Sequence, residues 1–443
     1  MTRLQDTAPP TGVESPNALK RRQAKYLFAL SAGHALEWYD WAMFGLLSVY
    51  IGQAFFPGDN PVASTLNSLA VFAVGFVVRP IGGVLFGLVA DRWGRKPVMV
   101  GAVAVTAGAS LIIGLTPTHE TIGVWAGVIV LLCRVLQGFS TGIEGSLGAA
   151  YGVELVPERP GYVAGFMATF NNFGNMLAPL TAFLAVSLLG PENMAEYGWR
   201  IPFIVGGLLG FIVLWLRRTL PETIDTDAAA ARKASGATSR SETREVWSGV
   251  RRYWLSILAV VFIVGALQAY NYTWLSGLPS IATGTYNEDP GGIFAVSTTL
   301  GIILTVGALV LSRVLDRWDL SRWFVVGRLL AIPTIFLVLL YTGNGVGAYA
   351  TVALGGALVL VLNLTIFSTV ANLMVPQKIR GTAVGLGYGL GVAIFGGTAS
   401  YLFVWLQSVG LGGVFPIYVA TLCAISVVLY ILAKRRNGVF KGR

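Results

Sequence analysis

Long apolar stretches recur along nearly the whole chain and are separated by short polar segments. Each approaches or exceeds the about 20 residues that a helix needs to cross a bilayer. The first half has such stretches at 26–51, 67–90, 97–115, 121–150, 162–189 and 201–217, and the second half at 254–280, 292–312, 323–341, 347–373, 382–408 and 414–433. We therefore predict an all-α polytopic membrane protein with twelve transmembrane helices.

Composition agrees with this prediction. Of the 443 residues, 55% are hydrophobic and only 12% are charged, whereas about one quarter of the residues in soluble domains are charged. The first 25 residues are polar and contain proline, and they lack the pattern of a cleaved signal peptide. The first helix is therefore expected to insert the chain.

The net charge of +10 follows from where the basic residues lie. They occupy alternate loops, which under the positive-inside rule places both termini and the central linker in the cytoplasm. This distribution explains the charge without a nucleic-acid partner. The basic groups are Lys20, Arg21, Arg22 and Lys25; Arg92, Arg95 and Lys96; Arg217, Arg218, Arg232, Lys233, Arg240, Arg244, Arg251 and Arg252; Lys378 and Arg380; and Lys434, Arg435 and Arg436.

An internal repeat divides the chain into halves. Asp91-Arg92-Trp93 recurs as Asp316-Arg317-Trp318, and Val156-Pro157 recurs as Val375-Pro376, both about half the chain length further on. We predict two six-helix bundles around a central cavity, as in transporters built from repeats. The expected segments are a cytoplasmic tail 1–25, a bundle 26–219, a cytoplasmic linker 220–252, a second bundle 253–433 and a cytoplasmic tail 434–443.

The segment Gly87–Pro97 places four charged groups between two apolar stretches. It resembles the signature loop that follows the second helix in the major facilitator superfamily. The resemblance implies the major facilitator fold and a cytoplasmic gate formed by Asp91, Arg95 and Glu154. A simple positive-inside anchor is the alternative.

Five further motifs narrow the resemblance to the metabolite:proton symporter family, which transports α-ketoglutarate, citrate, shikimate, or proline and betaine. They are Glu37-Trp38-Tyr39-Asp40, Arg79-Pro80-Ile81-Gly82-Gly83, Arg134 to Gly138 with Glu144, Gly198 to Phe203, and Phe395-Gly396-Gly397. The chain departs from the family pattern at His34, where relatives usually have Asn, and at Ile143, where they have Gly. Both positions lie near the expected cavity.

Charged residues inside the first two apolar stretches indicate a functional path, because a charge at the bilayer centre costs at least about 2.5–3.5 kcal/mol. His34, Glu37 and Asp40 share one helix face with Trp41. Arg79 is the expected counter-charge of Glu37 or Asp40. We predict that Glu37, Asp40 and Arg79 take part in proton coupling, and the alternative is a purely structural pair of Arg79 with Asp40.

The fourth apolar stretch repeats this arrangement, with Arg134, Gln137, Thr141 and Glu144 on one face. Arg134 and Glu144 are about 15 Å apart along a helix and must have different partners. The planar guanidinium of Arg134 suits a carboxylate substrate, and Glu144 can exchange a proton. Alternatively, Arg134 is an internal relay or a helix clamp without substrate contact.

Neutral polar residues could complete a substrate site. With Trp41, Arg134 and Gln137, the candidates are Asn171, Asn175, Gln268, Asn271, Tyr272 and Tyr388. Interhelical hydrogen bonding is the alternative role for each. Arg200, which precedes the sixth stretch, either attracts anions or anchors its helix at the interface.

Enzymatic function is not expected. The pattern Gly138-x-Ser140-x-Gly142 resembles a nucleophile elbow, but it lies in an apolar helix and not between a strand and a helix. No phosphate-binding loop follows a strand, which leaves an ion gradient as the energy source. His34 and His119 alone cannot form a histidine-based metal site, and we predict no cofactor or metal.

These inferences predict a monomeric secondary transporter in the cell membrane. We expect proton-coupled uptake of a small organic acid, a di- or tricarboxylate such as α-ketoglutarate, by alternating access. Three alternatives stay open at this point: proton symport of a zwitterionic osmolyte, proton-antiport export, and a membrane receptor or enzyme that transports nothing.

Overall fold

The computed structural model describes residues 16–156, 160–222, 247–315 and 318–437. In this part of the chain every regular element is a helix, and no strand occurs. Most of the predicted linker and the repeated pair Asp316-Arg317 lie outside the described residues, as does the side chain of Asp91.

Helices of the first half correspond to the six apolar stretches, with short extra turns. They are α1 (Pro16–Leu46) with α2 (Ser48–Phe55), α3 (Pro61–Trp93), α4 (Arg95–Leu115), the short α5 (His119–Ile122), α6 (Val124–Leu155), α7 (Pro160–Asn193) with the π-helix η1 (Met194–Gly198), and α8 (Arg200–Arg217).

The second half repeats this plan with more interrupted helices. They are α11 (Trp254–Tyr272), η2 (Thr273–Gly277) and α12 (Leu278–Gly284); α13 (Pro290–Leu315); α14 (Leu320–Ile335) with η3 (Phe336–Leu340); α15 (Val346–Gly355) with α16 (Ala357–Leu373); η4 (Gln377–Ile379), α17 (Arg380–Gly391), η5 (Val392–Gly396) and α18 (Gly397–Ser408); and α19 (Val414–Asn437).

Eleven spans in the described part of the chain are long and apolar enough to cross a membrane. We assign the twelfth predicted span to α1, which is not among these eleven. It has 31 residues, but His34, Glu37 and Asp40 make it less apolar than the others. The predicted all-helical, twelve-span architecture is confirmed.

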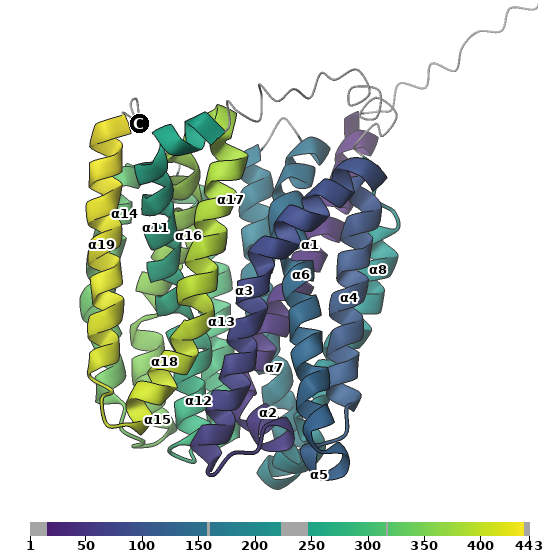
Figure 1. Ribbon diagram of the computed structural model, residues 1–443, viewed down its shortest axis with the longest axis vertical. Coiled ribbons are helices and arrows are strands. Elements are labelled where there is room, and N and C mark those ends of the chain that lie inside the picture. Colours follow the sequence, from purple (N-terminus) through teal and green to yellow (C-terminus); the bar gives the residue numbers. More distant parts are fainter. Residues whose placement is uncertain (1–15, 157–159, 223–246, 316–317, 438–443) are drawn as a thin grey trace, which may run out of the picture.

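The helices form two bundles that lie side by side (Figure 1). In the first bundle α3 packs on α6, α1 on α7 and α4 on α8; in the second, α11 packs on α17 and α19, and α14 on α16. The bundles meet along α7 with α13 and along α3 with α18 and η5. The helices α3, α7, α13 and α18 therefore line the interface between the bundles.

Glycines bring α3 and α6 into backbone contact. Gly138 lies directly against the carbonyl of Gly75, and Gly142 lies against the carbonyl of Arg79. Close backbone approach through small residues is a common way to join membrane helices. The adjacent Pro80 cannot donate a backbone hydrogen bond within α3. Arg79 therefore precedes a residue at which α3 lacks one backbone hydrogen bond, and its carbonyl lies against α6.

The two halves are joined at the end of the molecule opposite the C-terminus, where α2 and α12 lie (Figure 1). The hydroxyl groups of Ser48 and Ser280 are 2.8 Å apart and buried. Ser280 also donates to the carbonyl of Gly45. In this conformation the bundles are therefore in direct contact at that end.

The contact between α3 and α6 predicts that Gly138→Ala destabilises the protein, because the added methyl group meets the Gly75 carbonyl. Overpacking of this kind costs about 1–3 kcal/mol, so thermal unfolding in detergent should begin at a lower temperature. Gly101→Ala in α4 is the matched control, because it is exposed and no atom lies within 4 Å of the new methyl group. Equal melting temperatures for the two variants would contradict the proposed packing role.

Candidate functional site

Asp40 and Arg134 form a buried ion pair between α1 and α6. Arg134 Nη2 lies 3.1 Å from Asp40 Oδ2. The other carboxylate oxygen of Asp40 accepts hydrogen bonds from Gln137 Nε2 at 2.8 Å and from the Ser110 hydroxyl. Neither member of the pair has appreciable solvent exposure. The arrangement joins α1, α4 and α6 through one carboxylate.

This pairing differs from the pairing expected from the sequence. Arg79 was expected to pair with Glu37 or Asp40, but the partner of Asp40 is Arg134. The reason is the antiparallel course of α1 and α6, which brings Asp40 to Arg134 and, further along, His34 to Glu144. Arg134 is bound to Asp40, an arrangement compatible with the alternative role of a helix clamp, and its role in substrate binding stays a prediction.

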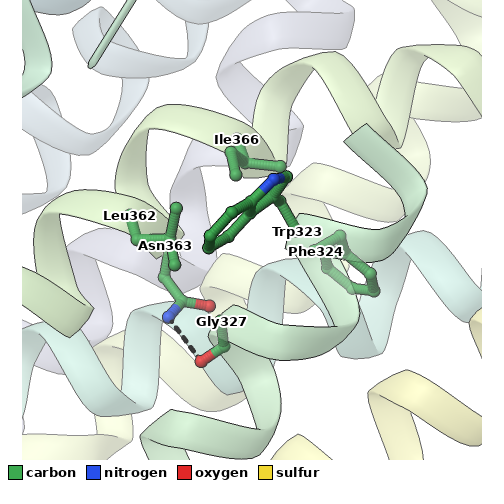
Figure 2. Close-up of a pocket in the computed structure, with 6 residues that line it drawn as sticks. All are labelled: Trp323, Phe324, Gly327, Leu362, Asn363 and Ile366. Carbon is green, nitrogen blue, oxygen red and sulfur yellow. Dashed lines mark hydrogen bonds between the residues drawn. The ribbon is translucent and has the colours of Figure 1, made fainter. Parts of the chain in front are cut away.

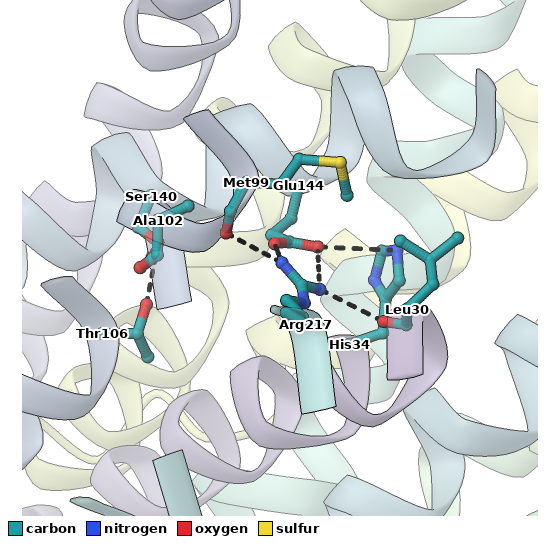
Figure 3. Close-up of polar contacts among 8 residues, drawn as sticks. All are labelled: Leu30, His34, Met99, Ala102, Thr106, Ser140, Glu144 and Arg217. Carbon is teal, nitrogen blue, oxygen red and sulfur yellow. Dashed lines mark hydrogen bonds and ion pairs between the residues drawn. The ribbon is translucent and has the colours of Figure 1, made fainter. Parts of the chain in front are cut away.

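Glu144 has a partner that the sequence analysis missed. Arg217, the last residue of α8, binds both carboxylate oxygens of Glu144, with Nη2 2.9 Å from Oε2 (Figure 3). It also donates to the backbone carbonyls of Met99 and Leu30. The expectation that Arg134 and Glu144 have separate partners is confirmed, but Arg217 had been counted among the basic residues of the linker.

His34 completes this second cluster. Its Nε2 lies 4.0 Å from Glu144 Oε2 (Figure 3). On the neighbouring α4–α6 seam, Thr106 and Ser140 share a hydrogen bond of 2.8 Å and Ser140 donates to the Ala102 carbonyl. The first bundle is therefore held together by ionic and hydroxyl contacts as well as by apolar packing.

Arg79 lies at the interface between the bundles and, unlike Arg134 and Arg217, forms no ion pair within the described part of the chain. Its guanidinium carbon is 3.8 Å from the ring centroid of Trp41 and 4.1 Å from that of Phe76. Trp41 is itself fixed by a hydrogen bond from Nε1 to the Thr141 hydroxyl at 2.8 Å. Arg79 is buried, and its Nε and Nη2 atoms have no hydrogen-bond partner among the described residues. These donors are available to a ligand.

Glu37 is the carboxyl group that faces Arg79. It is buried and interacts electrostatically with Glu144, Arg79 and Arg217, and its side chain also interacts with the Thr141 hydroxyl. Its Oε2 has no hydrogen-bond partner within the described part of the chain. Of the two carboxyl groups predicted to pair with Arg79, Glu37 interacts with it electrostatically but forms no ion pair with it among the described residues.

The second bundle contributes neutral polar groups to the same region. Tyr272 of α11 packs edge-on against Phe76 at 5.2 Å between ring centroids and interacts with both Arg79 and Glu37. Tyr388 of α17 interacts with the same two residues and with Gln268. These groups meet across the interface between the bundles. The predicted role of Tyr272, Tyr388 and Gln268 in substrate binding stays a prediction.

Three further amide residues, Asn171, Asn175 and Asn271, were predicted to line the cavity. The Oδ1 atoms of Asn171 and Asn271 lack a partner among the described residues, and Asn175 is buried. The helix α7, which carries Asn171 and Asn175, packs on α1 where Gly174 meets the Ala35 carbonyl. Cavity lining by these residues stays a prediction.

Three other polar residues of the spans lie away from this centre. Asn363 donates to the carbonyl of Gly327 at 2.9 Å in a narrow pocket between α14 and α16 (Figure 2). Arg328 is buried and donates to the Ile263 carbonyl. Arg200 donates to the carbonyls of Gly114 and Thr116. The contacts of Arg200 favour its alternative role as an anchor.

The predicted gate is placed within the first bundle. Arg95 forms an ion pair with Glu154 between α4 and α6. The carboxylate of Glu222, which the sequence analysis did not single out, accepts the backbone N–H groups of Arg95 and Lys96 at the start of α4. Gly94 precedes them with φ +92°, a conformation that favours glycine. These contacts join helices of one bundle, and the gating role stays a prediction.

His34, Glu37 and Glu144 have potential ligand atoms within 4.8 Å of one another. The sequence analysis considered only histidines as metal ligands and did not consider these two carboxylates. However, Arg217 binds Glu144 directly and Arg79 faces Glu37. These two positive charges already balance the carboxylates and disfavour a divalent cation.

Comparison with known proteins now identifies the family. Residues 30–400 match the model of the Major Facilitator Superfamily. The chain belongs to the Major Facilitator Superfamily. Its fold class, predicted from the sequence, is thereby confirmed.

Relatives within the superfamily differ in cargo. The chain is 32% identical to the alpha-ketoglutarate permease of Escherichia coli (strain K12) over 424 residues, covering 94% of this chain and 95% of the permease. It is 29% identical to the proline/betaine transporter of Salmonella typhimurium (strain LT2), covering 90% and 81% of the two chains. A crystal structure of a D-xylose-proton symporter superposes with a TM-score of 0.72 at 18% identity, covering 93% of this chain and 97% of the other. The chain is a multi-pass superfamily transporter.

The bidentate pair of Arg217 with Glu144 predicts a strong effect on stability. Glu144→Gln leaves the fully buried Arg217 without its counter-charge, and breaking a buried ion pair in this way costs about 3–5 kcal/mol. We expect a clear decrease in the melting temperature in detergent. The double variant Glu144→Gln with Arg217→Met removes both charges and should recover part of the loss. A double variant no more stable than Glu144→Gln would show that the pair is not the cause.

Proposed function

We propose that this transporter imports a small organic acid together with protons, by alternating access, across the cell membrane. Both termini lie in the cytoplasm in this proposal, as the basic loops suggest. The likeness to an alpha-ketoglutarate permease and to proline/betaine transporters supports a small carboxylate-bearing cargo. No enzymatic step is part of the proposal.

The observation that carries this proposal is the guanidinium of Arg79. It is buried at the interface of the two bundles, and two of its nitrogen atoms have no hydrogen-bond partner among the described residues. Arg134 also has guanidinium nitrogen atoms without a hydrogen bond, but it lies 3.1 Å from the Asp40 carboxylate, whereas Arg79 forms no ion pair within the described part of the chain. A buried charge needs a partner. Arginine binds carboxylates through paired, charge-assisted hydrogen bonds. Arg79 is therefore the residue best placed to receive the carboxylate of a substrate.

Coupling follows from the position of Glu37 beside Arg79. When Glu37 is ionised, its charge compensates Arg79; when it is protonated, the guanidinium requires another anion. Binding of a proton to Glu37 therefore favours binding of a carboxylate to Arg79. Asp40 and Glu144 were also predicted to couple, but each is already bound to its own arginine.

Alternating access is compatible with the contacts between the bundles. Ion pairs among the described residues of the spans lie inside the first bundle, whereas hydroxyl and aromatic contacts cross the interface. Rocking of one bundle against the other need not break a buried ion pair. The contact of Ser48 with Ser280 would have to open in each cycle.

A zwitterionic osmolyte is a weaker candidate for this site. Quaternary ammonium groups bind in cages of aromatic rings. Here, the faces of Trp41 and Phe76 are already occupied by the guanidinium of Arg79. The proline/betaine transporters among the relatives nevertheless require that betaine be tested.

Transport in proteoliposomes tests the proposed function. The purified protein should take up a labelled organic acid from a panel containing α-ketoglutarate, citrate, shikimate and pyruvate, faster when an inward proton gradient is imposed. Arg79→Gln should raise KM by at least about tenfold, because a charge-assisted hydrogen bond contributes about 1.5–3 kcal/mol. Initial rates at several substrate concentrations give this value.

The control for Arg79 is Arg322→Gln, which removes an exposed charge at the start of α14. It should leave the uptake unchanged. Uptake of betaine and of no organic acid would contradict the substrate class. Uptake that is insensitive to the proton gradient would contradict the coupling. Efflux of the organic acid driven by the inward proton gradient would indicate an exporter.

A cross-link between the bundles tests alternating access. The hydroxyl groups of Ser48 and Ser280 are 2.8 Å apart, so Ser48→Cys with Ser280→Cys should form a disulfide under oxidation. Uptake should then stop and return after reduction. The buried Cys133 and Cys423 are replaced by alanine in the background, and the single-cysteine variants serve as controls. Full activity of the oxidised double variant would exclude opening at this end.

A further inference from the structure

The charges that remain unpaired at the bundle interface limit the charge of the cargo. Among the described residues of the spans, Asp40 pairs with Arg134 and Glu144 pairs with Arg217. Each of these pairs is electrically balanced and buried. Of the remaining ionisable groups near the centre, His34 lies beside Glu144, and Arg79 and Glu37 interact electrostatically without forming an ion pair among the described residues.

The groups around Glu37 come from five other elements. They are Arg79 on α3, Thr141 and Glu144 on α6, Arg217 on α8, Tyr272 on α11 and Tyr388 on α17, and His34 lies one turn earlier on α1. Arg217 is neutralised by Glu144. With His34 as a neutral imidazole, the charge balance at the centre depends on one cation, Arg79, and one carboxyl group, Glu37.

The second bundle supplies no additional cation to this centre within the described part of the chain. Its contributions there are the neutral residues Gln268, Asn271, Tyr272 and Tyr388. Arg328, the buried cation of this bundle, is directed to the Ile263 carbonyl and to Phe324 of its own bundle. A second carboxylate on the cargo would thus be buried without a counter-charge, at a high desolvation cost.

We propose that the cargo is a small monocarboxylate with neutral hydrogen-bonding groups, and that it moves with one proton in an electroneutral step. This inference rests on the proposed function and narrows its substrate class. The carboxylate of the cargo binds Arg79, and the proton neutralises Glu37. The cargo adds one negative charge and the proton adds one positive charge, so the net charge of the loaded site equals that of the empty site.

The neutral lining fits the rest of such a cargo. The amide oxygen atoms of Gln268 and Asn271 and the hydroxyl of Tyr272 are buried without partners among the described residues. Buried polar groups of this kind are satisfied when a ligand provides hydroxyl or carbonyl groups. The rings of Trp41 and Phe76 close the site on the side of Arg79.

The test measures whether transport carries charge. Proteoliposomes receive an inward proton gradient, and valinomycin with potassium sets the membrane potential independently. Labelled pyruvate and shikimate are the monoanionic probes, α-ketoglutarate and citrate the multiply charged probes, and betaine the zwitterionic probe. We expect uptake of a monoanion that responds to the proton gradient and is unchanged when the potential is made negative inside.

Other outcomes overturn the inference in distinguishable ways. Slower uptake of α-ketoglutarate or citrate at a negative internal potential would show a net negative transported charge and refute the monocarboxylate assignment, while the proposed function would stand. Faster uptake of betaine at a negative internal potential would refute both the assignment and the organic-acid function. Transport of no member of the panel would refute the proposed function and this inference together.

A variant of Glu37 tests the role of the proton directly. Glu37→Gln fixes this position in a neutral form, so exchange of labelled for unlabelled monoanion should persist while accumulation driven by the proton gradient is lost. Glu37→Asp retains an ionisable group and should keep gradient-driven accumulation. Persistent gradient-driven accumulation in Glu37→Gln, or loss of exchange in a variant that melts like the parent, would overturn the assigned role.

Discussion

The cost of placing charge in the hydrocarbon core governs the structure of this protein. A charged group there must be paired with an opposite charge, be hydrated, or bind a substrate or proton. Arg134 and Arg217 meet this requirement through Asp40 and Glu144, and these pairs fix α1, α4, α6 and α8 in one relative register. Because these pairs neutralise four of the buried charged residues of the first bundle, Arg79 and Glu37 are the charged residues at the centre that form no ion pair within the described part of the chain.

The distribution of charge between the bundles also suits their relative movement. Ionic contacts in the described spans lie within the first bundle, and the second bundle presents tyrosine and amide groups to the centre. Contacts that cross the interface, such as Phe76 with Tyr272, are aromatic and individually weak. A rigid first bundle can therefore change its contacts with the second bundle at a moderate cost in free energy. Alternating access requires such a change.

The sequence predicted the fold well and the site only in part, for a physical reason. Apolar stretches of membrane-spanning length depend on composition alone, so the spans could be located without tertiary information. Ion pairs depend on how helices are rotated and shifted against each other, which no single helix encodes. Arg217 illustrates the limit: it is followed by Arg218 at the end of an apolar stretch, and only the packing of α8 shows that Arg217 is the fully buried one.

Resemblance to a family has the same limit when it is used to choose the cargo. The permease for alpha-ketoglutarate and the proline/betaine transporter resemble this chain to nearly the same degree, so identity cannot decide between a dianion and a zwitterion. The electrostatics of the centre provide a separate criterion, because a buried site binds the ligand whose charge completes its own balance. With Arg134 and Arg217 already neutralised, the centre retains one cation for the cargo and one carboxyl group for the proton, and a singly charged acid satisfies both.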